Sequence, residues 1–199
     1  VEQGFTAYIK LLQSNMQACG ALRIDHVMAL LRLWWVPQGE SAANGVYVYY
    51  PVELMLAILA LESQRHQCLV IGEDLGTVPD GMDDLLKNAG VYSYRVFCFE
   101  TAADGGYISP AHYPKQAMAT VVTHDMPTLK GYWHCDDLTL GKTLGLYPSQ
   151  ALVDQLMADR HKSKQLMLNS LFGHQALPNH ISECVDFVGM DRELSFGIQ

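Results

Sequence analysis

Short apolar runs alternate with helical stretches along this chain, and that alternation restricts its fold more than any other feature of the sequence. Four compact, mostly apolar runs are typical of strands buried on both faces of a parallel sheet: Gly20–Asp25, Cys68–Glu73, Tyr92–Phe99 and Ala117–Thr123. Three stretches of helical composition lie before and between them: Phe5–Ala18, Val52–Gln67 and Pro79–Ala89. The pattern predicts an α/β fold built from right-handed crossovers, either a (β/α)₈ barrel or a doubly wound open sheet.

The spacing of the strands indicates how much of such a fold is present. A complete barrel needs about 250 residues, so four strands in 199 residues amount to about half of one. The strands begin near residues 20, 68, 92 and 117, at intervals of 48, 24 and 25 residues. The later units are therefore minimal, whereas the first carries a long loop, Val27–Tyr50.

Composition excludes several classes of partner. With 13 Lys and Arg against 21 Asp and Glu, the formal charge is −8, so the chain lacks the basic face that nucleic acids and anionic membranes require. The longest apolar run, Leu54–Leu61, is far shorter than the ~20 residues that cross a bilayer. Five dispersed cysteines without a Cys-x-x-Cys pair indicate free thiols in a reducing cytoplasm.

Acidic residues follow three of the four expected strands. Asp25, Glu73 and Asp125 each lie at a strand's carboxyl end. In both α/β layouts the ligand crevice forms outside these ends, so the three carboxyl groups are expected to converge. Repulsion within one pocket can keep one of them protonated near neutral pH, which places an acid beside a nucleophile or base. Cleavage of a glycosidic bond uses such a pair of carboxyl groups.

Each of these residues also has a structural interpretation. An acidic residue after a strand is often the N-cap of the next helix, and only the coincidence of three favours a site. Arg23, two residues before Asp25, is expected to hold that carboxylate ionised, or to form a purely structural ion pair. His124 is expected to donate a hydrogen bond to a substrate hydroxyl, or to bond to backbone. His26 is assigned no chemistry.

The long loop after the first strand is rich in aromatic side chains. Trp34, Trp35, Tyr47 and Tyr49 lie within it, and aromatic faces suit the C–H surfaces of sugar rings. Loops of this length are usually functional or disordered, so at least one of the four is expected to be partly exposed towards the cleft. Trp34 and Tyr47 are the expected sugar contacts. The alternative, favoured for at least one of the two tryptophans, is packing as core beneath the loop.

Five sequence blocks follow one another along the chain: ALRIDHVMALLRLWWVPQGE, VIGEDLGTVP, VYSYRVFCFE, THDMPTLKGYW and DLTLGKTLGLYP. In order and spacing they resemble the 4-α-glucanotransferases called amylomaltases, bacterial maltodextrin enzymes of the α-amylase clan. The resemblance implies that Asp25 is the nucleophile, that Glu73 is the general acid/base, and that Asp125 binds and distorts the sugar at the cleavage point. It implies that Arg23 and His124 accompany them.

The same resemblance implies a retaining transfer of α-1,4-glucan segments, with maltodextrins and glucose as donor and acceptor and with no metal or organic cofactor. It implies a partial TIM barrel, roughly strands four to seven with their helices, in which all 199 residues belong to one catalytic domain. The chain is then an internal fragment without the first three strands and the closing strand, and inactive alone. Its last residues are expected to enter a helix. The resemblance does not indicate an oligomeric state.

Two other functions are compatible with parts of the pattern. A metal-dependent hydrolase on a similar barrel would use Asp25, His26, His124 and Asp125 as ligands, although the His-x-His pair usual in such sites is missing. A truncated product without enzymatic activity is the other alternative.

Overall fold

The computed structural model describes residues 4–177 and 181–188, and the chain divides into two compact units. Unit 1 comprises Val1–Tyr94 and Pro114–Met118, and unit 2 comprises Arg95–Tyr113 and Ala119–Gln199. The residues predicted to begin a helix at the end of the chain lie outside the described part. Among the helices that the structure describes, none has the length and apolar composition needed to cross a membrane.

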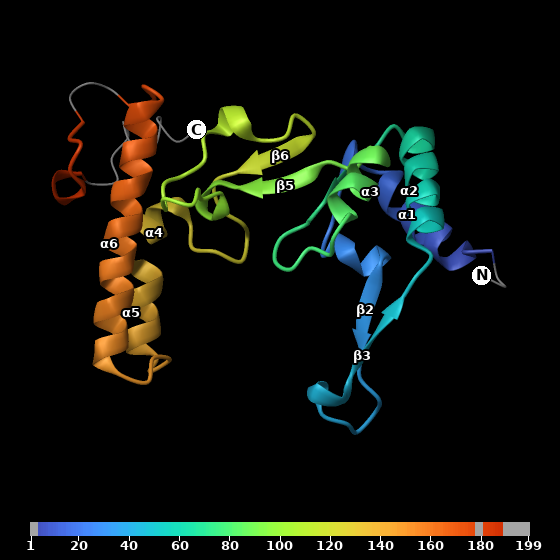
Figure 1. Ribbon diagram of the computed structural model, residues 1–199, viewed down its shortest axis with the longest axis horizontal. Helices are drawn as coiled ribbons and strands as arrows, with labels where there is room; N and C mark the ends of the chain where they lie inside the picture. The colour runs from blue at the N-terminus through green and yellow to red at the C-terminus, as the bar shows by residue number, and fades with distance from the viewer. Residues whose placement is uncertain (1–3, 178–180, 189–199) are drawn as a thin grey trace. The chain divides into compact units, whose positions relative to one another are not determined.

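Unit 1 contains the first two predicted strands and all three predicted helices (Figure 1). Its elements are α1 (Thr6–Met16), β1 (Ala21–Ile24), the 3₁₀ helix η1 (Val27–Leu30), β2 (Arg32–Trp35), the 3₁₀ helix η2 (Ala42–Asn44), β3 (Val46–Tyr49), α2 (Val52–His66), β4 (Leu69–Gly72) and α3 (Met82–Asn88). The charged residues at the ends of α2 interact favourably with the helix dipole. Glu53 lies in the first turn, and Arg65 and His66 lie in the last.

The predicted strands of unit 1 form a parallel pair. β1 and β4 are paired from Ala21↔Leu69 to Ile24↔Gly72. On its other side, β4 bonds to the start of the next predicted strand, because the Tyr92 N–H donates to the Val70 carbonyl oxygen at 2.9 Å. The predicted strands are therefore neighbours in chain order here, although each is shorter than its apolar run.

The core of unit 1 forms around two helices that lie side by side (Figure 1). Buried side chains of α1, such as Met16, and of α2, such as Leu59, belong to one apolar cluster with Val27 of η1 and Val70 of β4. This cluster fixes η1 against the β1–β4 pair, and η1 follows Asp25 and His26 directly.

The long loop Val27–Tyr50 is not an irregular connection. It contains η1, η2 and an antiparallel hairpin in which β2 pairs with β3, from Arg32↔Tyr49 to Trp35↔Val46. The hairpin extends away from α1 and α2 (Figure 1). β-Branched and aromatic residues explain its strand conformation, because they favour a pleated backbone.

Two short strands carry the chain between the units. β5 (Ser93–Val96) and β6 (Ala117–Thr120) form a two-stranded sheet, and each contributes residues to both units. β6 ends three residues before the predicted end at Thr123, so His124 and Asp125 lie in a turn and do not directly follow the strand.

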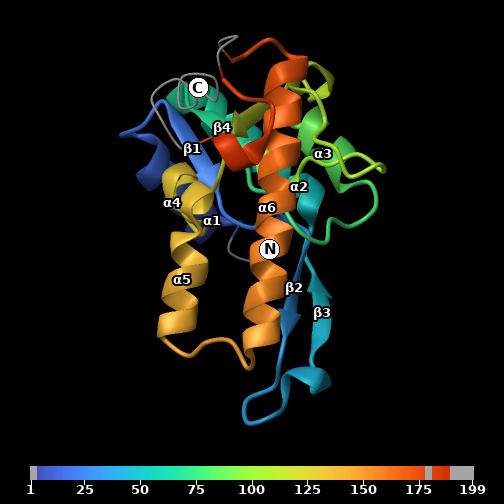
Figure 2. The same ribbon diagram turned by 90° about the vertical axis from the view of Figure 1, so that its left-hand side faces the viewer.

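Unit 2 is mainly helical. Its elements are η3 (Phe97–Phe99), η4 (Pro110–His112), α4 (Leu129–His134), α5 (Asp136–Thr143), α6 (Gln150–Gly173) and η5 (Val185–Phe187). The Thr128 and Ser149 hydroxyls cap α4 and α6 by accepting hydrogen bonds from the Gly131 and Leu152 N–H groups. α5 and α6 lie side by side (Figure 2).

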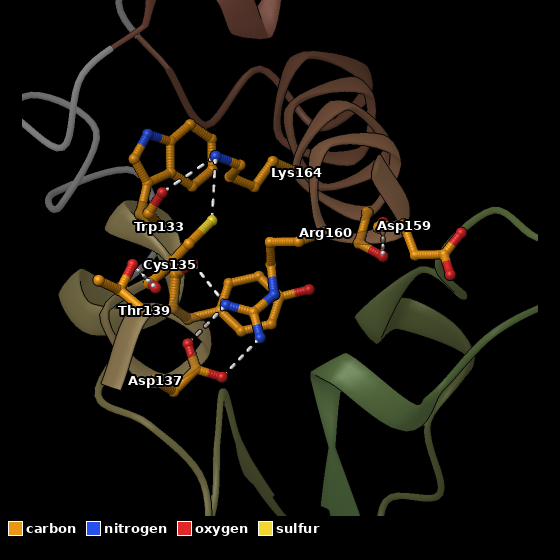
Figure 3. Close-up of polar contacts among 9 residues, drawn as sticks. Trp133, Cys135, Asp137, Thr139, Asp159, Arg160 and Lys164 are labelled. Carbon is orange, nitrogen blue, oxygen red and sulfur yellow. Dashed lines mark hydrogen bonds and ion pairs between the residues drawn. The ribbon is translucent and has the colours of Figure 1, made fainter. Parts of the chain in front are cut away.

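A bidentate ion pair joins α5 to α6 (Figure 3). Arg160 Nη1 and Nη2 donate to the two carboxylate oxygens of Asp137 at 3.0 and 2.8 Å. The guanidinium carbon lies 3.8 Å from the centroid of the Tyr132 ring, and Nη1 also donates to the Tyr132 carbonyl oxygen. Hydrogen bonding from Arg160 lowers the pKa of Asp137.

Asp137→Asn is expected to lower the free energy of unfolding at pH 7 by about 1–2 kcal/mol, because it removes a charge-assisted pair that is only partly exposed. Since the pKa of Asp137 is lowered by folding, this stabilisation is complete above the unfolded-state pKa of about 3.9 and is lost as pH falls through the folded-state value. Urea unfolding of the wild type and of Asp137→Asn at pH 7 and pH 3 measures this stabilisation. The control is Asp154→Asn, which alters an exposed pair with Gln150. Equal losses in the two variants at pH 7 would contradict the prediction.

Candidate functional site

Two of the predicted site residues lie at the adjoining carboxyl ends of β1 and β4. Ile24 and Gly72 are paired in the sheet, and Asp25 and Glu73 follow them directly. The ladder continues one step further, because the Glu73 N–H donates to the Ile24 carbonyl oxygen at 2.8 Å. The shared sheet edge therefore brings the backbones of Asp25 and Glu73 to neighbouring positions.

Backbone N–H groups orient the Glu73 carboxyl group. Oε2 accepts from the His26 N–H at 2.8 Å, and Oε1 accepts from the Leu75 N–H at 2.8 Å. His26 has a left-handed backbone conformation, with φ of 45°. The imidazole of His26 was assigned no chemistry, and it is the backbone N–H of this residue that contacts Glu73. Each carboxyl oxygen retains a second lone pair for a substrate.

The glycine before Glu73 permits a close approach. A Cβ atom at Gly72 would lie 3.0–3.1 Å from three atoms of the Val27 side chain, which is fully buried. The Val27 N–H also donates to the Glu73 carbonyl oxygen at 2.9 Å. Because no side chain separates β4 from η1, the turn that contains His26 lies within hydrogen-bonding distance of Glu73.

Asp25 has a different environment. Its side chain is exposed, and Oδ1 accepts a hydrogen bond from Arg23 Nη1 at 2.9 Å, so the predicted pairing of these two residues is present. Arg23 is itself held 5.2 Å from the centroid of the Tyr94 ring. The Asp25 carboxylate is thus oriented by a cation and remains accessible to a ligand.

Two other carboxyl groups of unit 1 are buried and have structural partners. Asp74 Oδ1 accepts from the Tyr94 N–H at 2.9 Å, which ties the end of β4 to β5. Glu62 of α2 accepts from Gln13 at 3.1 Å, and this hydrogen bond, together with that from Arg65, lowers its pKa. Of the adjacent acids, Glu73 is the one predicted to act in catalysis, and it is less buried than Asp74.

His124 and Asp125 belong to unit 2. Both side chains are exposed, and His124 Nε2 lies 3.4 Å from Asp125 Oδ1. The Asp125 N–H donates to Thr123 Oγ1 at 3.2 Å, which forms a local turn. Because Asp25 and Glu73 lie in unit 1, the convergence of all three carboxyl groups stays a prediction.

A cavity of about 250 Å³ in unit 1 adjoins the Glu73 loop. Its lining residues come from η1, the hairpin and the segment after β4: His26, Met28, Arg32, Tyr47, Leu75, Gly76, Thr77 and Pro79. His26 and Leu75, whose N–H groups bind Glu73, both line it. Tyr47, a predicted sugar contact, therefore lies at a cavity beside Glu73.

The aromatic side chains of the hairpin are exposed. The exposed fractions are 47% for Trp34, 56% for Trp35, 44% for Tyr47 and 63% for Tyr49, so these side chains are exposed as predicted, while their orientation towards a sugar cleft stays a prediction. The alternative that Trp34 or Trp35 packs as core is wrong. Because the hairpin extends away from the helices, both indole N–H groups find their partners within the loop itself. Trp34 Nε1 donates to the Ala42 carbonyl oxygen, and Trp35 Nε1 donates to the Tyr50 hydroxyl.

Two further observations concern other possible sites. In residues 4–177 and 181–188, no three His, Cys, Asp or Glu side chains are grouped as potential metal ligands, so the metal-site hypothesis gains no support there. A cavity of about 380 Å³ in unit 2 has a mainly apolar lining that includes Phe97 and Leu171. The described lining of that cavity contains none of the predicted site residues.

Known proteins resemble this chain over almost its whole length. A family model described as 4-alpha-glucanotransferase matches residues 1–189. A 4-alpha-glucanotransferase of Haemophilus influenzae is 47% identical over 178 residues, which cover 89% of this chain and 25% of that protein. The 4-alpha-glucanotransferase of Mycobacterium bovis is 38% identical over 168 residues, covering 80% of this chain and 23% of that protein.

Solved structures agree in fold. The crystal structure of amylomaltase from Corynebacterium glutamicum matches with a TM-score of 0.84 and 30% identity, over 96% of this chain and 26% of that one. Amylomaltase from Streptococcus agalactiae, solved in complex with acarbose, matches with a TM-score of 0.54 and 19% identity, over 84% of this chain and 33% of that one. The chain spans about a quarter of the length of the curated relatives.

Proposed function

The chain belongs to the 4-alpha-glucanotransferase family, and we propose that it supplies the reacting carboxyl groups of a retaining transfer of α-1,4-glucan segments between maltodextrins. One observation carries the proposal. Asp25 and Glu73 follow paired residues of parallel strands, yet Asp25 is exposed beside a cation and Glu73 is fixed by two N–H groups next to a cavity. Unlike environments suit two carboxyl groups with unlike roles.

In the first step we assign Glu73 as the general acid and Asp25 as the nucleophile. Glu73 protonates the leaving glycosidic oxygen while an Asp25 oxygen attacks the anomeric carbon, so the glycosidic bond breaks and a β-glucosyl ester forms. The hydrogen bond from Arg23 Nη1 orients the Asp25 carboxyl group for this attack. The hydrogen bonds from His26 and Leu75 keep Glu73 in one orientation.

In the second step the 4-hydroxyl of another sugar replaces water. Glu73, now a carboxylate, takes the proton of this hydroxyl group while the hydroxyl oxygen attacks the anomeric carbon. Asp25 then leaves as a carboxylate. Two inversions restore the α configuration. One glycosidic bond is broken and one is made in each cycle.

Asp125 and His124 complete the proposed site by binding and distorting the sugar at the cleavage point. This assignment requires strands β1, β4, β5 and β6 to serve as roughly the fourth to seventh strands of one (β/α)₈ barrel domain. The match to the amylomaltase of Corynebacterium glutamicum supports such a fold. The proposed chemistry needs no metal or organic cofactor.

The proposed setting follows from length and composition. Because the chain spans about a quarter of its relatives, we assign the activity to a full-length protein that carries these residues, and expect none from the 199 residues alone. The proposed location is the cytoplasm, since all five cysteines are free thiols.

The test is disproportionation by such a full-length protein. Incubation of maltotriose with isotopically labelled glucose is expected to place the label in longer maltodextrins without raising the concentration of reducing ends, because each cycle conserves glycosidic bonds. Addition of a chelator serves as the control and should leave the rate unchanged. A rise in reducing ends without labelled maltodextrins would show hydrolysis and refute the proposal.

A further inference from the structure

One face of the β2–β3 hairpin carries a cation between aromatic rings. Arg32 and Trp34 alternate along β2, and their register partners are Tyr49 and Tyr47. Residues two apart on a strand share a face, so these four side chains form one surface, which we call the Arg32 face. Leu33, Trp35, Val46 and Val48 occupy the opposite face.

Contacts within the Arg32 face fix its geometry. The Arg32 guanidinium carbon lies 4.0 Å from the Tyr47 ring centroid and 5.9 Å from that of Tyr49, and Nη1 donates to the Tyr49 hydroxyl at 3.1 Å. Trp34 meets Tyr47 edge-on, with centroids 4.9 Å apart and ring planes at 74°. A guanidinium stacked on a ring keeps its in-plane N–H groups available, and Arg has five such donors.

The Arg32 face borders the cavity beside Glu73 through two of its four side chains. Arg32 and Tyr47 line that cavity together with His26 and Leu75, the residues whose N–H groups hold the Glu73 carboxyl group. Its volume of about 250 Å³ is below the range of about 300–1,000 Å³ typical of drug-sized ligands, and suits a single hexose unit. Ring C–H groups can contact Tyr47 while hydroxyl groups accept from Arg32.

We propose that the Arg32 face binds the acceptor sugar, and that Arg32 determines how well an acceptor is held. The inference rests on the proposed function. There, Glu73 protonates the leaving oxygen and later deprotonates the incoming hydroxyl, so the sugar next to Glu73 is the leaving or accepting one, whereas the donor's anomeric carbon lies at Asp25. Arg32 touches no reacting atom, and its role is specificity.

The experiment separates the two half-reactions in a full-length enzyme that carries these residues. α-Glucosyl fluoride transfers its glucosyl group to Asp25 without a sugar on the leaving side, so glycosyl-enzyme formation does not use the acceptor position. The variants are Arg32→Met, which keeps an unbranched side chain but no donors, Arg32→Lys, which keeps the charge, and Val46→Ala, an exposed change on the opposite face. Circular dichroism verifies that each variant is folded.

Arg32→Met is expected to raise the KM for glucose as acceptor by about 10-fold, through loss of hydrogen bonds from a charged donor. The rate of glycosyl-enzyme formation should not change, and hydrolysis should rise relative to transfer. Arg32→Lys is expected to restore part of the acceptor affinity, and Val46→Ala to behave as wild type. An unchanged acceptor KM in Arg32→Met would overturn the inference, whether or not the glycosylation step slows. If the wild-type enzyme forms no glycosyl-enzyme, the proposed function itself fails, which is a different result.

Discussion

A full-length enzyme with Asp25→Asn is expected to lose glucan transfer by a factor on the order of 10⁴ or more, while it still binds maltodextrin. An amide is too poor a nucleophile to trap the anomeric carbon. The amide oxygen can still accept the hydrogen bond that Arg23 Nη1 donates to the carboxylate, and the residue is exposed, so the substitution leaves the fold of unit 1 intact. Labelled-glucose incorporation measures transfer, and calorimetric titration with maltotriose measures binding.

The control for this variant is Asp84→Asn, which removes an exposed carboxylate from the first turn of α3. It should retain transfer. Substantial transfer by Asp25→Asn would remove Asp25 from the nucleophile's role. Loss of both binding and transfer would assign Asp25 to substrate binding and not to covalent chemistry.

The sheet around Asp25 and Glu73 could be predicted because two local signals agree. The runs Gly20–Asp25 and Cys68–Glu73 are apolar and end in charged residues, and a parallel sheet puts such ends at one edge. The helix that follows each strand has dipole-matched termini or bounding glycines, and α2 and α3 lie within their predicted ranges. The prediction for β6 is three residues too long, because the apolar and β-branched residues Val121, Val122 and Thr123 continue the strand pattern beyond the end of the strand.

The hairpin and the helices of unit 2 were not predicted, for different reasons. The strands of the hairpin have four residues each, and apolar side chains lie on both faces, so no period-2 alternation of apolar and polar residues marks them. α6 has 24 residues, yet few of them are buried. Val153 is buried near its start, and the next buried residues are Met167 and Leu168. A helix whose buried residues lie fourteen positions apart shows little amphipathic period.

The candidate site was only partly accessible from sequence because its support comes from the backbone. Nothing in the residue types near His26 shows that its N–H donates to Glu73. That contact depends on a left-handed φ and on the missing side chain of Gly72, which lets Val27 approach. The pairing of Arg23 with Asp25 was predictable, since residues two apart on a strand share a side.

These backbone contacts affect how the general acid can be tested. In Glu73→Gln, one carboxyl oxygen becomes an NH₂ group, which is a donor and cannot accept from the N–H of His26 or Leu75. The amide variant therefore loses its proton and one orienting hydrogen bond together. Glu73→Ala also lacks the transferable proton, but it places no NH₂ group against a backbone N–H. Comparison of the two variants therefore separates the loss of the proton donor from a local distortion caused by the amide.

Both Glu73 variants are expected to accumulate a glycosyl-enzyme on Asp25 when supplied with α-glucosyl fluoride. Fluoride is a good leaving group that needs little protonation, so the first step proceeds, whereas the second step lacks its base. Transfer from ordinary maltodextrins should fall by about 10²–10⁴-fold, the usual contribution of general acid–base catalysis. Peptide mass spectrometry locates the adduct: a hexosyl group on the peptide that contains Asp25, missing in Asp25→Asn, supports the assignment. An adduct on any other residue would show that a different nucleophile attacks the anomeric carbon, and unimpaired maltodextrin transfer in Glu73→Ala would show that another group supplies the proton.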